Sequence, residues 1–179
     1  MTANLDVGLR DYWIHYLRRQ SSALYAVLDA ARAPRIESLA RRLGSYASLF
    51  DGDEAEALHD VAPYLVALAP THWLFDELIA EAWGNAWGVF LTSRAPLMHV
   101  RAHLQALMHA ETEAGERYLF RFYDPRVMRA IVPVCRPDEL DELFGPIERF
   151  IVESRAPTWA WELSREGAGY TRARIGVAA

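Results

Sequence analysis

The segment Phe120–Arg126, which reads FRFYDPR, sets the strongest local constraint on how this chain folds. Asp124 can accept a hydrogen bond from an unpaired backbone N–H in the first turn of a helix. Pro125 suits the first helical position, where its missing N–H leaves no hydrogen bond unmade. We therefore expect an apolar strand over 118–123 to end in a tight turn, followed by a helix over 125–132.

Apolar segments typical of strands alternate with amphipathic segments typical of helices along most of the chain. Asp51-Gly52-Asp53-Glu54 reads as a solvated turn. The alternation predicts an α/β fold with an at least partly parallel sheet flanked by helices. The expected strands cover 23–28, 46–50, 64–68, 87–91, 118–123 and 149–153, and the expected helices cover 6–19, 34–43, 71–83, 96–109, 125–132 and 138–144.

The composition changes after Gly145-Pro146, and we divide the chain at that point. We expect an N-terminal amphipathic helix within 1–22, an α/β core over 23–146 and a short C-terminal β-rich appendage over 147–179. In the appendage Trp159, Trp161 and Leu163 alternate with polar or small residues and share one side of a short strand. The residues from Gly167 onward are small and polar, so we expect them to fray.

Composition and charge exclude some classes of function. The net charge is −5, and the 19 basic residues are all arginines scattered along the chain, which argues against nucleic-acid binding. Cys135 is the single cysteine, so no intramolecular disulfide can form. The first residues lack the pattern of a signal peptide, and no apolar run is long enough to cross a membrane. We expect a cytoplasmic protein without a nucleic-acid or membrane partner.

Asp29 and Asp124 each follow a predicted strand, and ligands of open α/β sheets bind at that edge. An aspartate there can equally cap the next helix, and we interpret both as structural because no partner base or metal cluster accompanies them. Arg121 and Arg126 flank the turn and could clamp a carboxylate or a phosphate. Since Arg121 lies inside a predicted apolar strand, it needs a charged partner, and Asp29 is the expected one.

The sequence gives only weak signals for a metal site, a phosphate-binding loop or a reactive cysteine. His99 and His103 have the i, i+4 spacing of two metal ligands, but Val100 stands where the zinc-protease pattern needs glutamate, and no third ligand is evident. We therefore expect no metal. The glycines of the segment 83–88 precede a strand, whereas those of a phosphate-binding loop precede a helix. We therefore interpret the tryptophans of this segment as core anchors, and we expect no cofactor. Cys135 reads as a small buried apolar residue.

Four short sequence motifs precede the Asp-Pro turn, in this order: Leu24–Asp29 (LYAVLD), Pro63–Val66 (PYLV), Trp83-Gly84 and Trp87–Leu91 (WGVFL). With the turn, they make the segment from about 24 to 145 resemble the bacterial type VI secretion effector-adaptor chaperones, a family first catalogued as a domain of unknown function. Many relatives carry a longer second lobe, which is only a short segment here. The motif residues that we interpret as mainly structural are Asp29, Tyr64, Trp83, Gly84, Arg121, Asp124, Pro125 and Arg126.

The resemblance implies a non-catalytic adaptor whose partners are a secreted effector protein and the tip protein of the type VI spike. An alternative is a small α/β enzyme that uses Asp29, Asp124 and Arg126 on a phosphate- or carboxylate-bearing substrate at the carboxyl edge of the sheet. A structural or immunity-like partner of the same system is a third possibility. Trp159 and Trp161 either pack on the core or anchor a protein partner.

Overall fold

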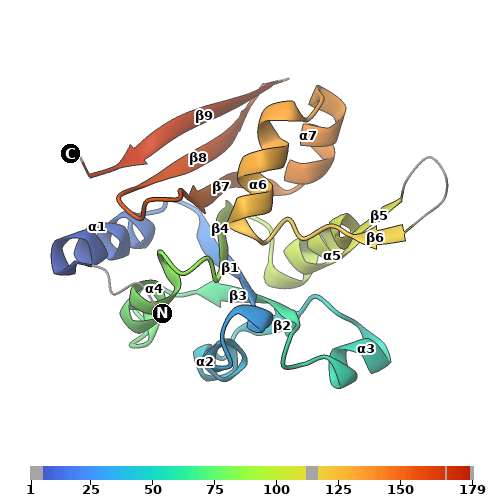
Figure 1. Ribbon diagram of the computed structural model, residues 1–179, viewed down its shortest axis with the longest axis horizontal. Helices are drawn as coiled ribbons and strands as arrows, with labels where there is room; N and C mark the ends of the chain where they lie inside the picture. The colour runs from blue at the N-terminus through green and yellow to red at the C-terminus, as the bar shows by residue number, and fades with distance from the viewer. Residues whose placement is uncertain (1–5, 112–116, 168, 178–179) are drawn as a thin grey trace.

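The computed structural model describes residues 6–111, 117–167 and 169–177 (Figure 1). Its centre is a seven-stranded sheet in the order β2-β3-β1-β4-β7-β8-β9, and a separate two-stranded hairpin pairs β5 with β6. The strands are β1 (Ala23–Asp29), β2 (Tyr46–Ser48), β3 (Pro63–Leu68), β4 (Gly88–Ser93), β5 (His109–Glu111), β6 (Arg117–Leu119), β7 (Ile147–Glu153), β8 (Trp159–Glu166) and β9 (Gly169–Gly176).

The predicted partly parallel sheet is wrong, because neighbouring strands in this sheet are antiparallel at every pairing. The central strands β1, β3 and β4 are apolar along almost their whole length, since helices cover both of their faces. Strands of parallel sheets are buried in the same way, so the apolar pattern reports burial on both faces but not strand direction.

Helices form a layer on each face of the sheet (Figure 1). On one face lie α1 (Val7–Arg18), α2 (Arg35–Leu43) and α4 (Phe75–Ala82), and on the other lie α5 (Leu97–Met108), α6 (Pro125–Ile131) and α7 (Pro137–Phe144). The helix α3 (Gly52–Ala57) lies beside β2, while η1 (Ala30–Arg32) and η2 (Val132–Val134) are single 3-10 turns. One hydrophobic cluster runs through both layers and includes residues of α1, of the central strands and of β7 and β8.

Most elements lie near their predicted positions, and four do not. The predicted solvated turn over 51–54 begins helix α3 instead. The predicted helix over 71–83 begins only at Phe75. The predicted strand over 118–123 is limited to β6, which pairs with β5, so Arg121 does not lie in a strand. The segment from Gly167, predicted to fray, forms β9, which pairs with β8 along its whole length; positions 168 and 178–179 of that segment lie outside the described residues.

Candidate functional site

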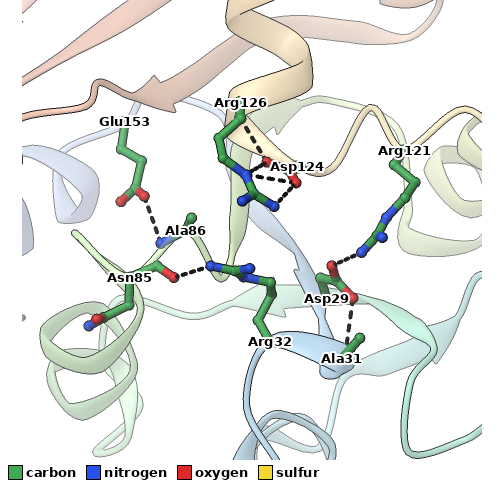
Figure 2. Close-up of polar contacts among 9 residues, drawn as sticks. All are labelled: Asp29, Ala31, Arg32, Asn85, Ala86, Arg121, Asp124, Arg126 and Glu153. Carbon is green, nitrogen blue, oxygen red and sulfur yellow. Dashed lines mark hydrogen bonds and ion pairs between the residues drawn. The ribbon is translucent and has the colours of Figure 1, made fainter. Parts of the chain in front are cut away.

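Three buried carboxylates from different elements lie around one end of the sheet, close to the Asp-Pro turn (Figure 2). Asp29 ends β1, Asp124 precedes α6, and Glu153 ends β7. Their residues are 1%, 5% and 7% exposed, respectively. A buried carboxylate needs hydrogen bonds or an opposite charge, so the partners of these three side chains define what the site can do.

Asp29 joins the end of β1 to the turn before α6. Its Oδ1 accepts a hydrogen bond from the backbone N–H of Ala31 at 3.2 Å, and its Oδ2 accepts one from Nη2 of Arg121 at 2.5 Å. Burial lowers the pKa of Arg121, but the charge and the hydrogen bond of Asp29, together with Tyr123, outweigh burial, so the net shift is upward. The ion pair predicted from the sequence is therefore present, although Arg121 reaches it from a turn and its side chain remains 43% exposed.

Asp124 caps α6, as the sequence predicts. Its Oδ1 accepts the backbone N–H of Arg126 at 2.8 Å, and Pro125 occupies the first helical position. The guanidinium of Arg126 folds back onto the same carboxylate, with Nη2 at 2.5 Å from Oδ2. Burial raises the pKa of Asp124, but the hydrogen bonds from Arg126 outweigh burial and hold the pKa below its ordinary value. The side chain of Arg126 thus pairs with the carboxylate that caps the helix to which Arg126 belongs.

Glu153 fastens the turn after α4 to the end of β7. Its two carboxylate oxygens accept the backbone N–H groups of Gly84 at 2.6 Å and of Ala86 at 2.8 Å. Gly84 and Ala86 both have positive φ, at 83° and 51°, so the turn is tight. Burial raises the pKa of Glu153 to about 6, against these two hydrogen bonds. No sequence pattern indicates this role of Glu153, whose only signal is its place at the end of an apolar strand.

Two further arginines lie near these acids and were not singled out from the sequence. Arg32 points into the group and donates to the backbone carbonyl of Asn85 at 3.5 Å (Figure 2). Its charge contributes to lowering the pKa values of Asp124 and Glu153. Arg129 on α6 donates to the backbone carbonyl of Glu153 at 2.5 Å. Arginines therefore surround the three acids on several sides.

The remaining motif residues lie apart from this group. Tyr64 is buried on β3, where its hydroxyl donates to the carbonyl of His59 at 2.7 Å. Trp83 is buried at the end of α4 and stacks on Trp13 of α1, with ring centroids 4.0 Å apart. Both residues hold neighbouring segments together.

The histidines expected to lie on a solvated helical face differ from each other. His99 is exposed, whereas His103 is half-buried and its Nε2 lies 3.2 Å from the carbonyl oxygen of Leu143. Cys135 is half-buried, and burial raises the pKa of its thiol. Across 6–111, 117–167 and 169–177, no group of three or more His, Cys, Asp and Glu side chains could hold a metal ion. In the same ranges no helix has the length and apolar character needed to cross a membrane.

Trp159 and Trp161 form an edge-to-face pair on β8, with centroids 5.0 Å apart. Both residues are half-buried, and Trp161 packs against the hydrophobic core. Neighbouring arginines of β9 cover the rings: Arg174 lies 4.7 Å from the centroid of Trp159, and Arg172 lies 4.3 Å from that of Trp161. The two tryptophans are thus half-buried, each with an arginine of β9 over its ring.

A family model described as "Domain of unknown function (DUF4123)" matches residues 24–142. The matched segment begins in β1 and ends within α7, so it contains Asp29 and Asp124 but not Glu153, β8 or β9. No curated protein and no solved structure matches the chain.

Proposed function

The chain belongs to the DUF4123 family, and we propose that it is a non-catalytic adaptor that binds a secreted effector protein and helps load it onto a type VI secretion spike. The adaptor acts in the cytoplasm, with the effector and the spike tip protein as its partners. The motifs of the segment 24–145 support this proposal, because they resemble those of effector-adaptor chaperones.

The observation that carries the non-catalytic part of the proposal is the internal use of all three buried acids. A general acid, a general base or a nucleophile must present an atom to a substrate. Asp29 instead holds Arg121 and Ala31, and Asp124 holds the backbone and guanidinium of Arg126. Glu153 holds a backbone turn with both oxygens. These contacts fasten the Asp-Pro turn and the 84–86 turn to the sheet, which suits a rigid binding scaffold.

The proposal is tested by co-purification and secretion. The tagged protein is expressed in its own bacterium, and the proteins that co-purify with it are identified by mass spectrometry. We expect one secreted effector and a spike tip protein in the eluate. Deleting the gene should remove that effector from the culture medium while other substrates of the same apparatus are still secreted. Unchanged secretion of every substrate would contradict the proposal.

The enzyme alternative makes a different prediction for the same residues. If Asp29 only fixes the fold, Asp29→Asn should lower the melting temperature and partner capture together. If Asp29 performs chemistry, the variant should lose turnover of a phosphate- or carboxylate-bearing substrate at an unchanged melting temperature. The two measurements on one variant therefore separate the adaptor from the enzyme.

A further inference from the structure

A basic, aromatic surface extends over α6, β8 and β9 on one face of the sheet. Arg129 lines two adjoining hollows, one with Trp161 and Arg172, the other with Trp159 and Arg155. Arg174 on β9 covers Trp159. We call this the arginine–tryptophan surface, and its members are Arg129, Arg155, Trp159, Trp161, Arg172 and Arg174.

The four arginines of this surface lack carboxylate partners within the described part of the chain. Arg172 and Arg174 lie over indole rings, and Arg129 donates to a backbone carbonyl. Burial lowers the pKa of Arg129; Glu153 opposes this effect, and the nearby charge of Arg155 adds to it. Cations are thus held close together in a chain of net charge −5, and an anionic occupant would relieve their repulsion.

The outer edge of β9 offers backbone hydrogen bonds to a polypeptide. β9 is the last strand of the sheet, and its outer side is open in the described structure (Figure 1). The N–H of Val177 donates to the carbonyl of Thr158 across the β8–β9 pair. By the alternation of an antiparallel ladder, the backbone N–H and C=O groups of Tyr170, Arg172 and Arg174 point away from β8. These groups can pair with one more strand.

The charge on β9 disfavours a second copy of this chain at that edge. Two β9 strands related by a twofold axis perpendicular to the sheet would bring Arg172 and Arg174 of both copies onto the same face. Like charges that face each other across strands are destabilising. A strand with acidic side chains on that face would instead form opposite-charge pairs.

We propose that the arginine–tryptophan surface and the edge of β9 together bind an extended acidic segment of a protein partner. The segment adds to the sheet as an eighth strand, and its alternate carboxylates face Arg172 and Arg174. The backbone contacts distinguish a polypeptide from a small anion, which could use only the arginines. This inference rests on the proposed function, in which the partner is the effector.

A synthetic peptide tests the charge requirement. The probe is a blocked octapeptide of alternating glutamate and threonine, and its control has glutamine in place of glutamate. We expect binding of the glutamate peptide and at least tenfold weaker binding of the control. The variant Arg172→Gln/Arg174→Gln should also lose about tenfold in affinity. The charge-matched variant Arg19→Gln/Arg94→Gln, on exposed arginines elsewhere, should lose less than twofold. Equal losses in the two variants would overturn the proposal.

Amide hydrogen exchange followed by NMR tests the added strand. Saturating glutamate peptide should slow exchange of the amides of Tyr170, Arg172 and Arg174 by tenfold or more. Peptide binding without this protection would mean that charge alone holds the peptide, and the strand proposal would fail. Protection that rises with protein concentration in the absence of peptide would assign the edge to a second copy and would also overturn it.

The experiments on this surface can fail independently of the test of the adaptor proposal. If the peptide does not bind and the Arg172→Gln/Arg174→Gln variant still captures the effector, this inference fails and the adaptor proposal stands. If the peptide binds but no effector co-purifies with the protein, the surface stands and the adaptor proposal fails.

Discussion

Trp13 and Trp83 donate their indole N–H groups to one acceptor, the carbonyl oxygen of Pro157, at 2.8 and 3.1 Å. The two rings stack with centroids 4.0 Å apart, and both are fully buried. Trp13 belongs to α1, Trp83 follows α4, and Pro157 lies in the turn between β7 and β8. A single carbonyl thus joins the N-terminal helix, one layer of the core and the C-terminal strands.

Replacing Trp13 should therefore destabilise the whole fold. Trp13→Phe loses one buried hydrogen bond, worth about 1 kcal/mol, and leaves unfilled volume, so we expect a total loss of about 2 kcal/mol in the free energy of unfolding. Trp73, which is 69% exposed, provides the control, and Trp73→Phe should change stability by less than about 0.5 kcal/mol. Denaturant unfolding measures both. Equal stabilities of the two variants would contradict the role of the shared carbonyl.

The ion pair between Asp29 and Arg121 should show strong coupling. Arg121→Gln leaves a buried carboxylate without its cation, so we expect a loss of about 1.5–3 kcal/mol. Asp29→Asn should cost a similar amount, and the double variant should cost clearly less than the sum. The exposed pair between Arg165 and Asp141, 2.6 Å apart, is the control, with an expected coupling below about 1 kcal/mol. Additive effects at Asp29 and Arg121 would show that the pair does not stabilise the turn.

The sequence predicts local contacts of the site better than the arrangement of the sheet. The cap at Asp124 depends on neighbouring residues, and its chemistry is legible in the order Asp-Pro-Arg. The pair between Asp29 and Arg121 is not local, and its prediction follows from the expectation that a charge in an apolar strand has a partner, although Arg121 lies outside the strand expected there. The antiparallel order could not be predicted, because apolar runs such as that of β1 record burial and not direction.

Two other features depend on contacts that no local pattern shows. Glu153 binds a turn almost 70 positions earlier in the chain, and nothing near Glu153 indicates that partner. β9 consists mainly of exposed residues and is held by pairing with β8, so its polar composition resembles that of a fraying end. In both cases tertiary pairing overrides the local signal.

Glu153 should make stability depend on pH. Its pKa is about 6 in the folded protein against an ordinary value of 4.5, so the folded state holds this proton more tightly than the unfolded chain does. The stabilisation from this group is therefore fully present below pH 4.5 and is lost as the pH rises through 6. The shift corresponds to about 2 kcal/mol.

The measurement compares wild type with Glu153→Gln, in which this titration is absent. On going from pH 7.5 to pH 4.5, the wild type should gain about 1–2 kcal/mol of unfolding free energy relative to the variant. A constant difference between the two proteins, or a relative loss for the wild type at pH 4.5, would contradict the raised pKa.

A comparison of the helix caps of α1 and α6 measures what Arg126 contributes to stability. Asp6 accepts the N–H of Gly8 at 2.9 Å in the same way as Asp124 accepts that of Arg126, but Asp6 is exposed. Asp6→Ala should cost about 1 kcal/mol, the usual loss of a helix cap. Asp124→Ala should cost more, about 2–3 kcal/mol, because the charged hydrogen bonds from Arg126 are also lost. Equal costs for the two caps would mean that the guanidinium of Arg126 adds nothing to stability.

Trp159 and Trp161 should differ in what they do for the isolated protein. Trp161 packs on the core beside Met128 and Leu163, whereas Trp159 borders a hollow lined largely by arginines. Because both rings are only half-buried, each alanine variant should cost less than the roughly 3–5 kcal/mol of a fully buried tryptophan. We expect about 2 kcal/mol for Trp161→Ala and under about 1 kcal/mol for Trp159→Ala.

Thermal melting measures the difference in stability, and capture of the glutamate peptide measures partner binding. Trp159→Ala should weaken peptide binding at a nearly unchanged melting temperature, since it removes the ring that supports Arg174. A Trp159→Ala variant that melts well below the wild type, or that binds the peptide as tightly as the wild type, would show that this ring belongs to the core and not to the binding surface.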